Sequence, residues 1–206
     1  MDKPRWIALM CRLGLDDNAD TFDQLLTAYS DPERHYHNVR HIHAMLDWLD
    51  KRRDDAQQPD VIELAIWFHD AIYKPFSSTN EQDSADWAAQ FLTSADPSEA
   101  GSAISEKVSA LILATASHAL SDDPDTQLLL DLDLAILGCN ETAFAEFERG
   151  VRHEYRHVPQ FLYRKKRAQV LNQFLAMPQI YQTAYFVEHF ETQARENLRH
   201  AIAELS

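Results

Sequence analysis

The residues best suited to chemistry lie in an apolar segment, residues 65–73, where His69 and Asp70 stand side by side. Burying such polar groups without partners is costly. A divalent metal ion removes that cost, because short bonds to nitrogen and oxygen replace the lost hydration. The pair therefore predicts a metal site.

Further candidate ligands lie on either side of this pair. His41 lies upstream in a histidine-rich segment, and Asp131 and Asp133 lie downstream in a second apolar run. Each spacing is long enough for a connection and a return on a neighbouring helix, so several helices can converge on one inward-facing site. Residues two apart on a helix face nearly opposite ways. Only one of the two aspartates is therefore expected to be a ligand, and the other would cap a helix or face solvent.

Two histidines and two carboxylates would form a mixed nitrogen and oxygen site. Such a site suits Mn²⁺, Fe²⁺, Co²⁺, Ni²⁺, Zn²⁺ or Mg²⁺ better than soft metals, and better than Ca²⁺, which prefers oxygen cages. Four protein ligands leave positions open for water and substrate, as in catalytic sites. An ion there would lower the pKa of bound water and polarise a phosphoryl oxygen, which are the two requirements of phosphoester hydrolysis.

The composition predicts an all-α protein. The chain has only 4 Gly among its 206 residues, and Leu, Ala, Glu and Gln outnumber the β-branched residues typical of strands. Apolar residues at helical spacing predict one single-domain helical bundle over residues 1–206, with a metal-site core at about 30–140 and C-terminal helices at about 140–205. The helix at 61–73 is apolar nearly all round, so it should be buried. The predicted helices cover about 6–13, 22–29, 41–49, 61–73, 81–91, 98–115, 128–137, 144–155, 161–175 and 179–205.

The charge and cysteine content narrow the possible partners and location. The formal net charge is -14, from 19 basic and 33 acidic residues, so no basic surface for long nucleic acids is expected. Cys11 and Cys139 lack metal-binding spacing and cannot form a disulfide framework. The N-terminus lacks a signal-peptide core, and no apolar run is long enough for a membrane span. These features predict a soluble cytoplasmic protein, with no indication of its oligomeric state.

The ordered set His41…His69-Asp70…Asp133 resembles the ligand pattern of the HD-domain superfamily of metal-dependent phosphohydrolases. The resemblance extends over about residues 30–200 and is narrowest to a bacterial subfamily described as predicted HD phosphohydrolases. It implies a helical fold of the HD-domain type and a bound divalent metal, and it favours Asp133 over Asp131 as the last ligand. It implies no particular substrate. The motifs that carry it are Tyr36-His37-Asn38-x-x-His41-Ile42, Phe68-His69-Asp70-x-x-Tyr73, Asn80-Glu81-x-x-Ser84-Ala85, Thr115-x-x-His118, Asp131-x-Asp133-Leu134-x-Ile136-Leu137-Gly138 and Arg152-x-Glu154-Tyr155.

Four other residues are candidates for catalytic roles, and each has a purely structural alternative. Glu81 is a candidate general base or water-orienting group, or else part of a helix start. His118 would hold a second metal or bind phosphate, or else favour the dipole at a helix end. Arg167 or Arg152 would bind phosphate through a guanidinium fork, although most residues of this basic cluster must be solvated.

For three residues near the predicted ligands, the sequence likewise allows either a role in the site or a purely structural role. His37 and Asn38 precede His41 by about one turn and would orient it, or else cap the helix. Tyr73 lies about a turn beyond His69 and would reach the mouth of the site, or else pack against the core.

These residues favour a metal-dependent phosphohydrolase with a small phosphorylated substrate such as a nucleotide. His41, His69, Asp70 and Asp133 would hold the metal, and Asp70, Glu81, His118 and Arg167 would take part in catalysis. Two alternatives remain open. One is a di-iron oxygenase, which needs further histidine ligands. The other is a non-catalytic nucleotide-sensing protein with a vestigial metal site.

Overall fold

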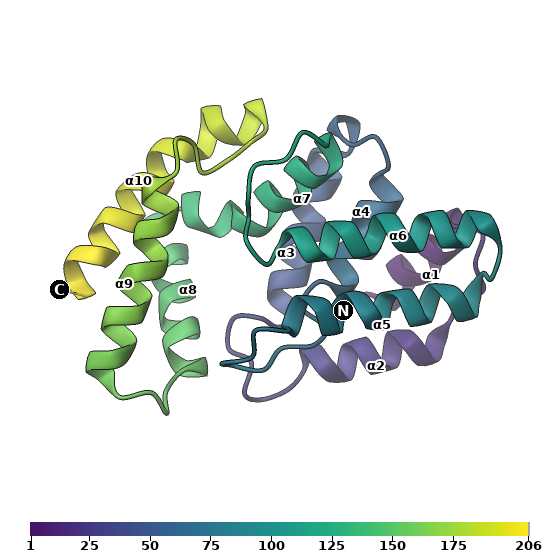
Figure 1. Cartoon of the computed structure of the whole chain (residues 1–206), viewed down its shortest axis with the longest axis horizontal. Coiled ribbons are helices and arrows are strands. Elements are labelled where there is room, and N and C mark those ends of the chain that lie inside the picture. Colours follow the sequence, from purple (N-terminus) through teal and green to yellow (C-terminus); the bar gives the residue numbers. More distant parts are fainter. Residues whose placement is uncertain (206) are drawn as a thin grey trace. The chain divides into compact units, whose positions relative to one another are not determined.

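The computed structural model describes residues 1–205 as α-helices joined by loops, with two 3-10 turns and no β-strand in that range (Figure 1). The all-α prediction is confirmed. The helices form two compact units, Met1–Leu129 and Leu130–Ser206, with the boundary inside α7 (Pro124–Leu134). The prediction of one domain over the whole chain stays a prediction. Within the described range, no helix has both the length and the apolar content needed to cross a membrane.

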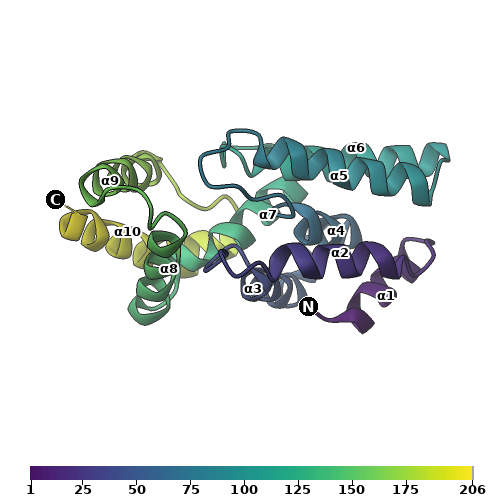
Figure 2. The ribbon, with the colours of Figure 1, turned by 90° about the horizontal axis from the view of Figure 1, so that it is seen from below.

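The first unit is organised around α4, as expected of its apolar sequence. Every side chain from Val61 to Phe68 is buried, including the carboxylate-bearing Glu63. The rings of Trp6 and Trp67 meet edge to face with 5.6 Å between their centroids. Helix α5 also packs against α4. Helices α5 and α6 lie side by side in both views (Figures 1 and 2). The helices of this unit are α1 (Lys3–Arg12), α2 (Ala19–Tyr29), α3 (Val39–Lys51), η1 (Arg53–Asp55), α4 (Pro59–Phe68), α5 (Asn80–Ala95) and α6 (Glu99–Ala114), followed by the first part of α7.

Helix α4 ends at Phe68, so the prediction that it continues to about Tyr73 was wrong. The chain turns at this point, since the amide of Ala71 donates to the carbonyl of Phe68 at 2.9 Å. The amide of Ile72 donates instead to the hydroxyl of Ser84 on α5, at 3.0 Å. These bonds replace the helical ones, and they place His69 and Asp70 on a turn at the end of a buried helix.

Helix α7 begins at Pro124, earlier than the apolar pattern predicted. Proline is favoured in the first turn of a helix, because its missing amide would have no helical partner there. The Asp123 carboxylate accepts a 2.9 Å hydrogen bond from the amide of Thr126 and so acts as the cap. This polar first turn carries no apolar stripe, which explains why the start was misplaced.

The second unit contains the end of α7 and the C-terminal helices. Its two longest helices, α9 and α10, pack against each other, and α10 also packs on η2. Gly138 allows the second contact, because a Cβ at this position would lie 2.8 Å from the carbonyl oxygen of Phe190. The helices of this unit, after α7, are η2 (Ala135–Gly138), α8 (Glu141–Glu154), α9 (Gln160–Ala176) and α10 (Ala184–Leu205).

Helix α10 starts at Ala184 rather than near Gln179, because side chains take the backbone amides of the preceding segment. The Glu191 carboxylate accepts hydrogen bonds from the amides of Ile180 and Tyr181. Asp131 accepts those of the next two residues. The segment is therefore held in a non-helical conformation before the helix begins.

Candidate metal centre

Three of the four predicted ligands come together within the first unit. His41 lies on α3, and His69 and Asp70 lie on the turn after α4. The Nε2 atoms of the two histidines are 3.2 Å apart, and Asp70 Oδ2 is 3.2 Å from His69 Nε2 and 3.7 Å from His41 Nε2. Two donors at right angles, each about 2.1 Å from an ion, lie roughly 3 Å apart. His41, His69 and Asp70 therefore form a group that could hold a metal ion.

The second ring nitrogen of His69 fixes its tautomer. Nδ1 lies 3.0 Å from the carbonyl oxygen of Ile66, which can only accept a hydrogen bond. Nδ1 therefore carries the proton, and Nε2 of the neutral ring presents its lone pair toward His41 and Asp70. Such a hydrogen bond to the outer nitrogen is typical of metal-ligating histidines.

The carboxylate of Asp70 is strongly favoured in its charged form. Burial raises the pKa of Asp70, but the neighbouring imidazoles oppose this rise when they are protonated: His69 acts through its charge and a hydrogen bond from Nε2, and His37 and His41 act through their charges. The net effect holds the pKa of Asp70 well below its usual range. An anionic oxygen beside two imidazoles is a suitable donor set for a divalent cation of intermediate softness.

Arg34 fastens the turn that carries His69 and Asp70. Its guanidinium donates to the carbonyl oxygens of Asp70 at 2.7 Å and Ala71 at 2.9 Å, and to that of His37 at 3.3 Å. The arginine thus joins the segment before α3 to the turn after α4. The sequence analysis missed this residue, because its partners are backbone carbonyls that no side-chain pattern reveals.

Aromatic rings pack beside the three donors. His37 stacks on Tyr73 with 4.1 Å between ring centroids and 22° between planes, while Tyr36 lies 4.9 Å from the ring of His41. Asn38 is the N-cap of α3, since its side chain accepts from the amide of Arg40 at 2.9 Å. The capping alternative for Asn38 is therefore confirmed, and His37 contacts both Tyr73 and Tyr36.

The start of α5 lies against the segment that follows Asp70. Asn80 exchanges two hydrogen bonds with the backbone of Lys74, at 3.0 and 3.1 Å, next to the bond between Ile72 and Ser84. Glu81 follows immediately and is half-buried, and its carboxylate makes no hydrogen bond or ion pair with any residue from 1 to 205. Its carboxylate is therefore not committed to a structural contact, and its catalytic role stays a prediction.

His118 follows the end of α6, and its amide donates to the carbonyl of Ala114 at 3.1 Å. The residue adopts a left-handed backbone with φ of 50°, which is uncommon outside glycine. Its side chain is half-buried. Its role in metal or phosphate binding stays a prediction.

The two competing aspartates of α7 differ in their surroundings. Asp131 is fully buried and accepts hydrogen bonds from the amide of Gln182 at 2.8 Å, and from the amide of Thr183 at 2.7 Å and its hydroxyl at 2.6 Å. Burial raises the pKa of Asp131 to about 6, although these hydrogen bonds oppose the rise. Asp131 is thus a structural cap within the second unit. Asp133 is the penultimate residue of α7 and is half-buried, and its role as a ligand stays a prediction.

The candidate phosphate-binding arginines have partners in the second unit. Arg167 Nε lies 3.2 Å from both carboxylate oxygens of Glu148, and its guanidinium packs over the ring of Phe147. Arg152 donates to the carbonyl oxygens of Tyr155 and Val158. A catalytic role for Arg167 stays a prediction, and the structure shows it as one half of an ion pair.

No family model matches this chain, and no curated protein or solved structure matches it either. The family resemblance of the sequence motifs is thus neither supported nor contradicted by known proteins. The candidate metal centre rests on the positions of His41, His69 and Asp70 and on the hydrogen bonds that hold them.

Proposed function

We propose that the protein is a metal-dependent phosphohydrolase of the HD-domain type, acting on a small phosphate ester such as a nucleotide. The observation that carries the proposal is the approach of His41 Nε2, His69 Nε2 and Asp70 Oδ2 to within 3.7 Å of one another. Both imidazoles are almost completely buried, where unpaired nitrogens would be costly.

The residues fit a divalent cation by their chemistry. His69 is oriented by Ile66, its lone pair faces the other donors, and Asp70 supplies negative charge. A divalent ion bound there supplies a lowered pKa for bound water and polarisation of a phosphoryl oxygen. Asp133 is the fourth ligand that the sequence predicts.

The surrounding residues have separate proposed tasks. Glu81, whose carboxylate makes no hydrogen bond or ion pair within residues 1–205, would accept the proton of the attacking water at a carboxylate oxygen. Arg34 would keep His69 and Asp70 in register with α3 through its bonds to backbone carbonyls. His37 and Tyr73, stacked beside the donors, would restrict the access of water.

The test combines metal analysis with a panel of phosphoesters, applied to the wild type and to the variants His41→Gln and His43→Gln. His43 is a matched control because it lies on the same helix but is exposed. We expect the wild type to bind a divalent ion and to hydrolyse at least one phosphoester. We expect His41→Gln to lose both properties and His43→Gln to keep both. A wild type that binds no divalent ion, or that hydrolyses none of the esters, would refute the proposal.

A further inference from the structure

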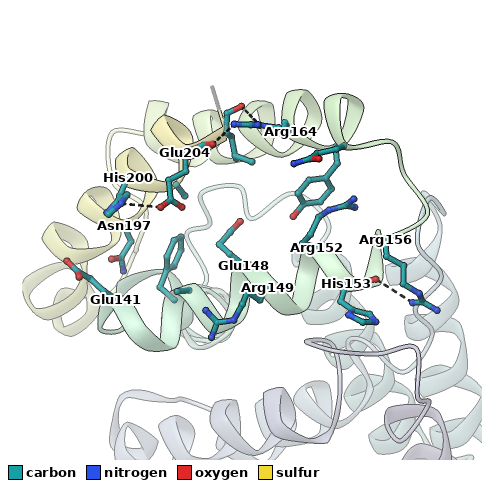
Figure 3. Close-up of a pocket in the computed structure, with 16 residues that line it drawn as sticks. Glu141, Glu148, Arg149, Arg152, His153, Arg156, Arg164, Asn197, His200 and Glu204 are labelled. Carbon is teal, nitrogen blue, oxygen red and sulfur yellow. Dashed lines mark hydrogen bonds and ion pairs between the residues drawn. The ribbon is translucent and has the colours of Figure 1, made fainter.

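The second unit contains a groove that the candidate metal centre does not use. Helices α8, α9 and α10 line it, and it encloses about 810 Å³ (Figure 3). Binding sites for small molecules typically have volumes of about 300–1,000 Å³, with apolar walls and a few placed polar groups. Phe144 and Ala201 supply buried apolar wall, and Tyr163 and Arg152 are among the polar lining residues.

Tyr163 carries a polar group that the fold leaves unsatisfied. The residue is 8% exposed, and its hydroxyl is enclosed without a hydrogen-bond partner among residues 1–205. Buried hydroxyls normally have a hydrogen-bond partner, so the Tyr163 hydroxyl retains an unused donor. Burial raises the pKa of Tyr163 to about 12, so the hydroxyl keeps its proton at neutral pH and can donate.

Arg152 brings a cation to the same ring. Its guanidinium carbon lies 4.6 Å from the centroid of Tyr163. Two of its nitrogens donate to the carbonyl oxygens of Tyr155 at 2.6 Å and Val158 at 3.3 Å. No carboxylate of the described chain forms an ion pair with it. Since a guanidinium has five N–H donors in a planar fork, donors remain for an incoming oxyanion.

Two of the three carboxylates that line the groove, Glu148 and Glu204, already have partners. Glu148, which lies one turn before Arg152, is bound by Arg167. Arg164 donates to the carbonyl oxygens of Glu204 and Leu205 near the end of α10. The Glu204 carboxylate lies 3.5 Å from His200. The four arginines that line the groove, Arg149, Arg152, Arg156 and Arg164, outnumber its three carboxylates, and Arg152 is the one that lies over the ring of Tyr163.

A remaining acid, Glu141, stands too far from Arg152 to balance it. The two residues occupy opposite ends of α8 (Figure 3), and eleven helical steps separate them by about 16 Å along the axis. The groove therefore has a cationic end beside Tyr163 and an apolar wall between its ends.

We propose that this groove binds a small molecule with an oxyanion, either a carboxylate or a phosphate, joined to an apolar body. The oxyanion accepts hydrogen bonds from the Tyr163 hydroxyl and the free N–H groups of Arg152, and the apolar body lies against Phe144 and Ala201. The site lies wholly on the second unit and is independent of the proposed phosphohydrolase activity.

The test uses three probes with one phenyl ring each: 3-phenylpropanoate, phenylphosphonate and the uncharged 3-phenylpropan-1-ol. Amide chemical shifts of the full chain are followed during titration at constant ionic strength. We expect at least one anion to shift amides of α8 and α9, with an affinity at least tenfold above that of the alcohol. The two anions distinguish a carboxylate ligand from a phosphate ligand.

Variants locate the binding site. We expect Tyr163→Phe and Arg152→Lys to weaken anion binding about tenfold, as expected for losing one charge-assisted hydrogen bond. Tyr163→Phe keeps the ring and its packing, so this variant tests the site even if a change at Arg152 disturbs the end of α8. Lys166→Gln is the matched control, since this exposed cation of α9 does not line the groove, and we expect it to bind the anions as the wild type does.

Three outcomes would overturn the proposal. The first is equal binding of the alcohol and the anions, and the second is no anion binding at 10-millimolar probe, about the weakest affinity this titration detects. The third is unchanged anion binding by Tyr163→Phe. Asp70→Asn is included because it removes a proposed metal ligand; we expect it to bind the anions as the wild type does, whether or not the metal proposal holds.

Discussion

The guanidinium of Arg34 donates a 2.7 Å hydrogen bond to the carbonyl oxygen of Asp70. A second nitrogen of the same group binds the carbonyl of Ala71 at 2.9 Å. Arg34 lies shortly before α3, which carries His41, so this one side chain connects the two segments that supply the candidate metal ligands. The spacing of the ligands therefore depends on a residue that is not itself a ligand.

We expect Arg34→Lys to weaken metal binding while the protein stays folded. A lysine presents a single ammonium in place of the planar fork and cannot hold both carbonyls in the same geometry. Loss of a group that orients metal ligands typically lowers affinity about 10- to 100-fold. Competition with a chromophoric chelator measures the affinity. Arg40→Lys, a change at an exposed arginine on α3, is the control, and an equal effect in both variants would contradict the positioning role.

The sequence predicted the candidate metal ligands better than it predicted the residue and the turn that hold them in place. His41, His69 and Asp70 stood out because polar groups in apolar helices need partners, and the structure brings them together. Arg34 did not stand out, because its partners are main-chain oxygens exposed by a turn. The turn itself was also missed, since the apolar residues beyond Phe68 continue the pattern of a buried helix.

The helical class followed from composition and periodicity, whereas helix ends followed from local side-chain contacts. Asp123 starts α7 early, and Asp131 and Glu191 delay the start of α10. Each contact joins a side chain to a backbone amide, and the bond between Asp131 and Gln182 joins elements that are distant in sequence. Periodicity carries no information about such bonds, so the predicted ends were displaced.

Removal of metal should lower the thermal stability of the wild type. A metal that binds only the folded state stabilises it by RT ln(1 + [L]/Kd), which is about 2.7 kcal/mol at one hundred times Kd. We expect a chelator to lower the unfolding temperature of the wild type but not that of Asp70→Asn. Differential scanning calorimetry checks this, and an equal drop in both proteins would mean that the chelator removes metal from another place.

Substitution by asparagine should mainly lower stability at Asp131 and mainly lower metal content at Asp133. Asp131→Asn replaces one acceptor oxygen by an NH₂ group that must face either the amide of Gln182 or the amide and hydroxyl of Thr183, so we expect a loss of about 1–3 kcal/mol in unfolding free energy. Asp133→Asn should cost less stability but lower metal content, as the sequence resemblance predicts. Urea denaturation and metal analysis on both variants check this. Metal loss from Asp131→Asn alone would reverse the assignment.

The buried carboxylate of Glu63 should support the fold but not the metal centre. On α4, six positions before His69, it accepts from Arg5 at 2.8 Å and Arg12 at 2.7 Å, with Arg53 at 3.4 Å, and is 1% exposed. Removing one partner of a buried ion pair typically costs about 3–5 kcal/mol, because the remaining charges are left without compensation. We expect Glu63→Gln to lose stability in that range by urea denaturation.

The exposed partner of Arg5 provides the control for this change. Asp50 binds the same guanidinium at 2.7 Å, but its side chain is 52% exposed, so we expect Asp50→Asn to cost about 0–1 kcal/mol. Metal content per folded molecule should stay at the wild-type value in both variants, because neither residue contacts His41, His69 or Asp70. Loss of metal from folded Glu63→Gln would mean that the charge network of α4 also sets the position of the turn after Phe68.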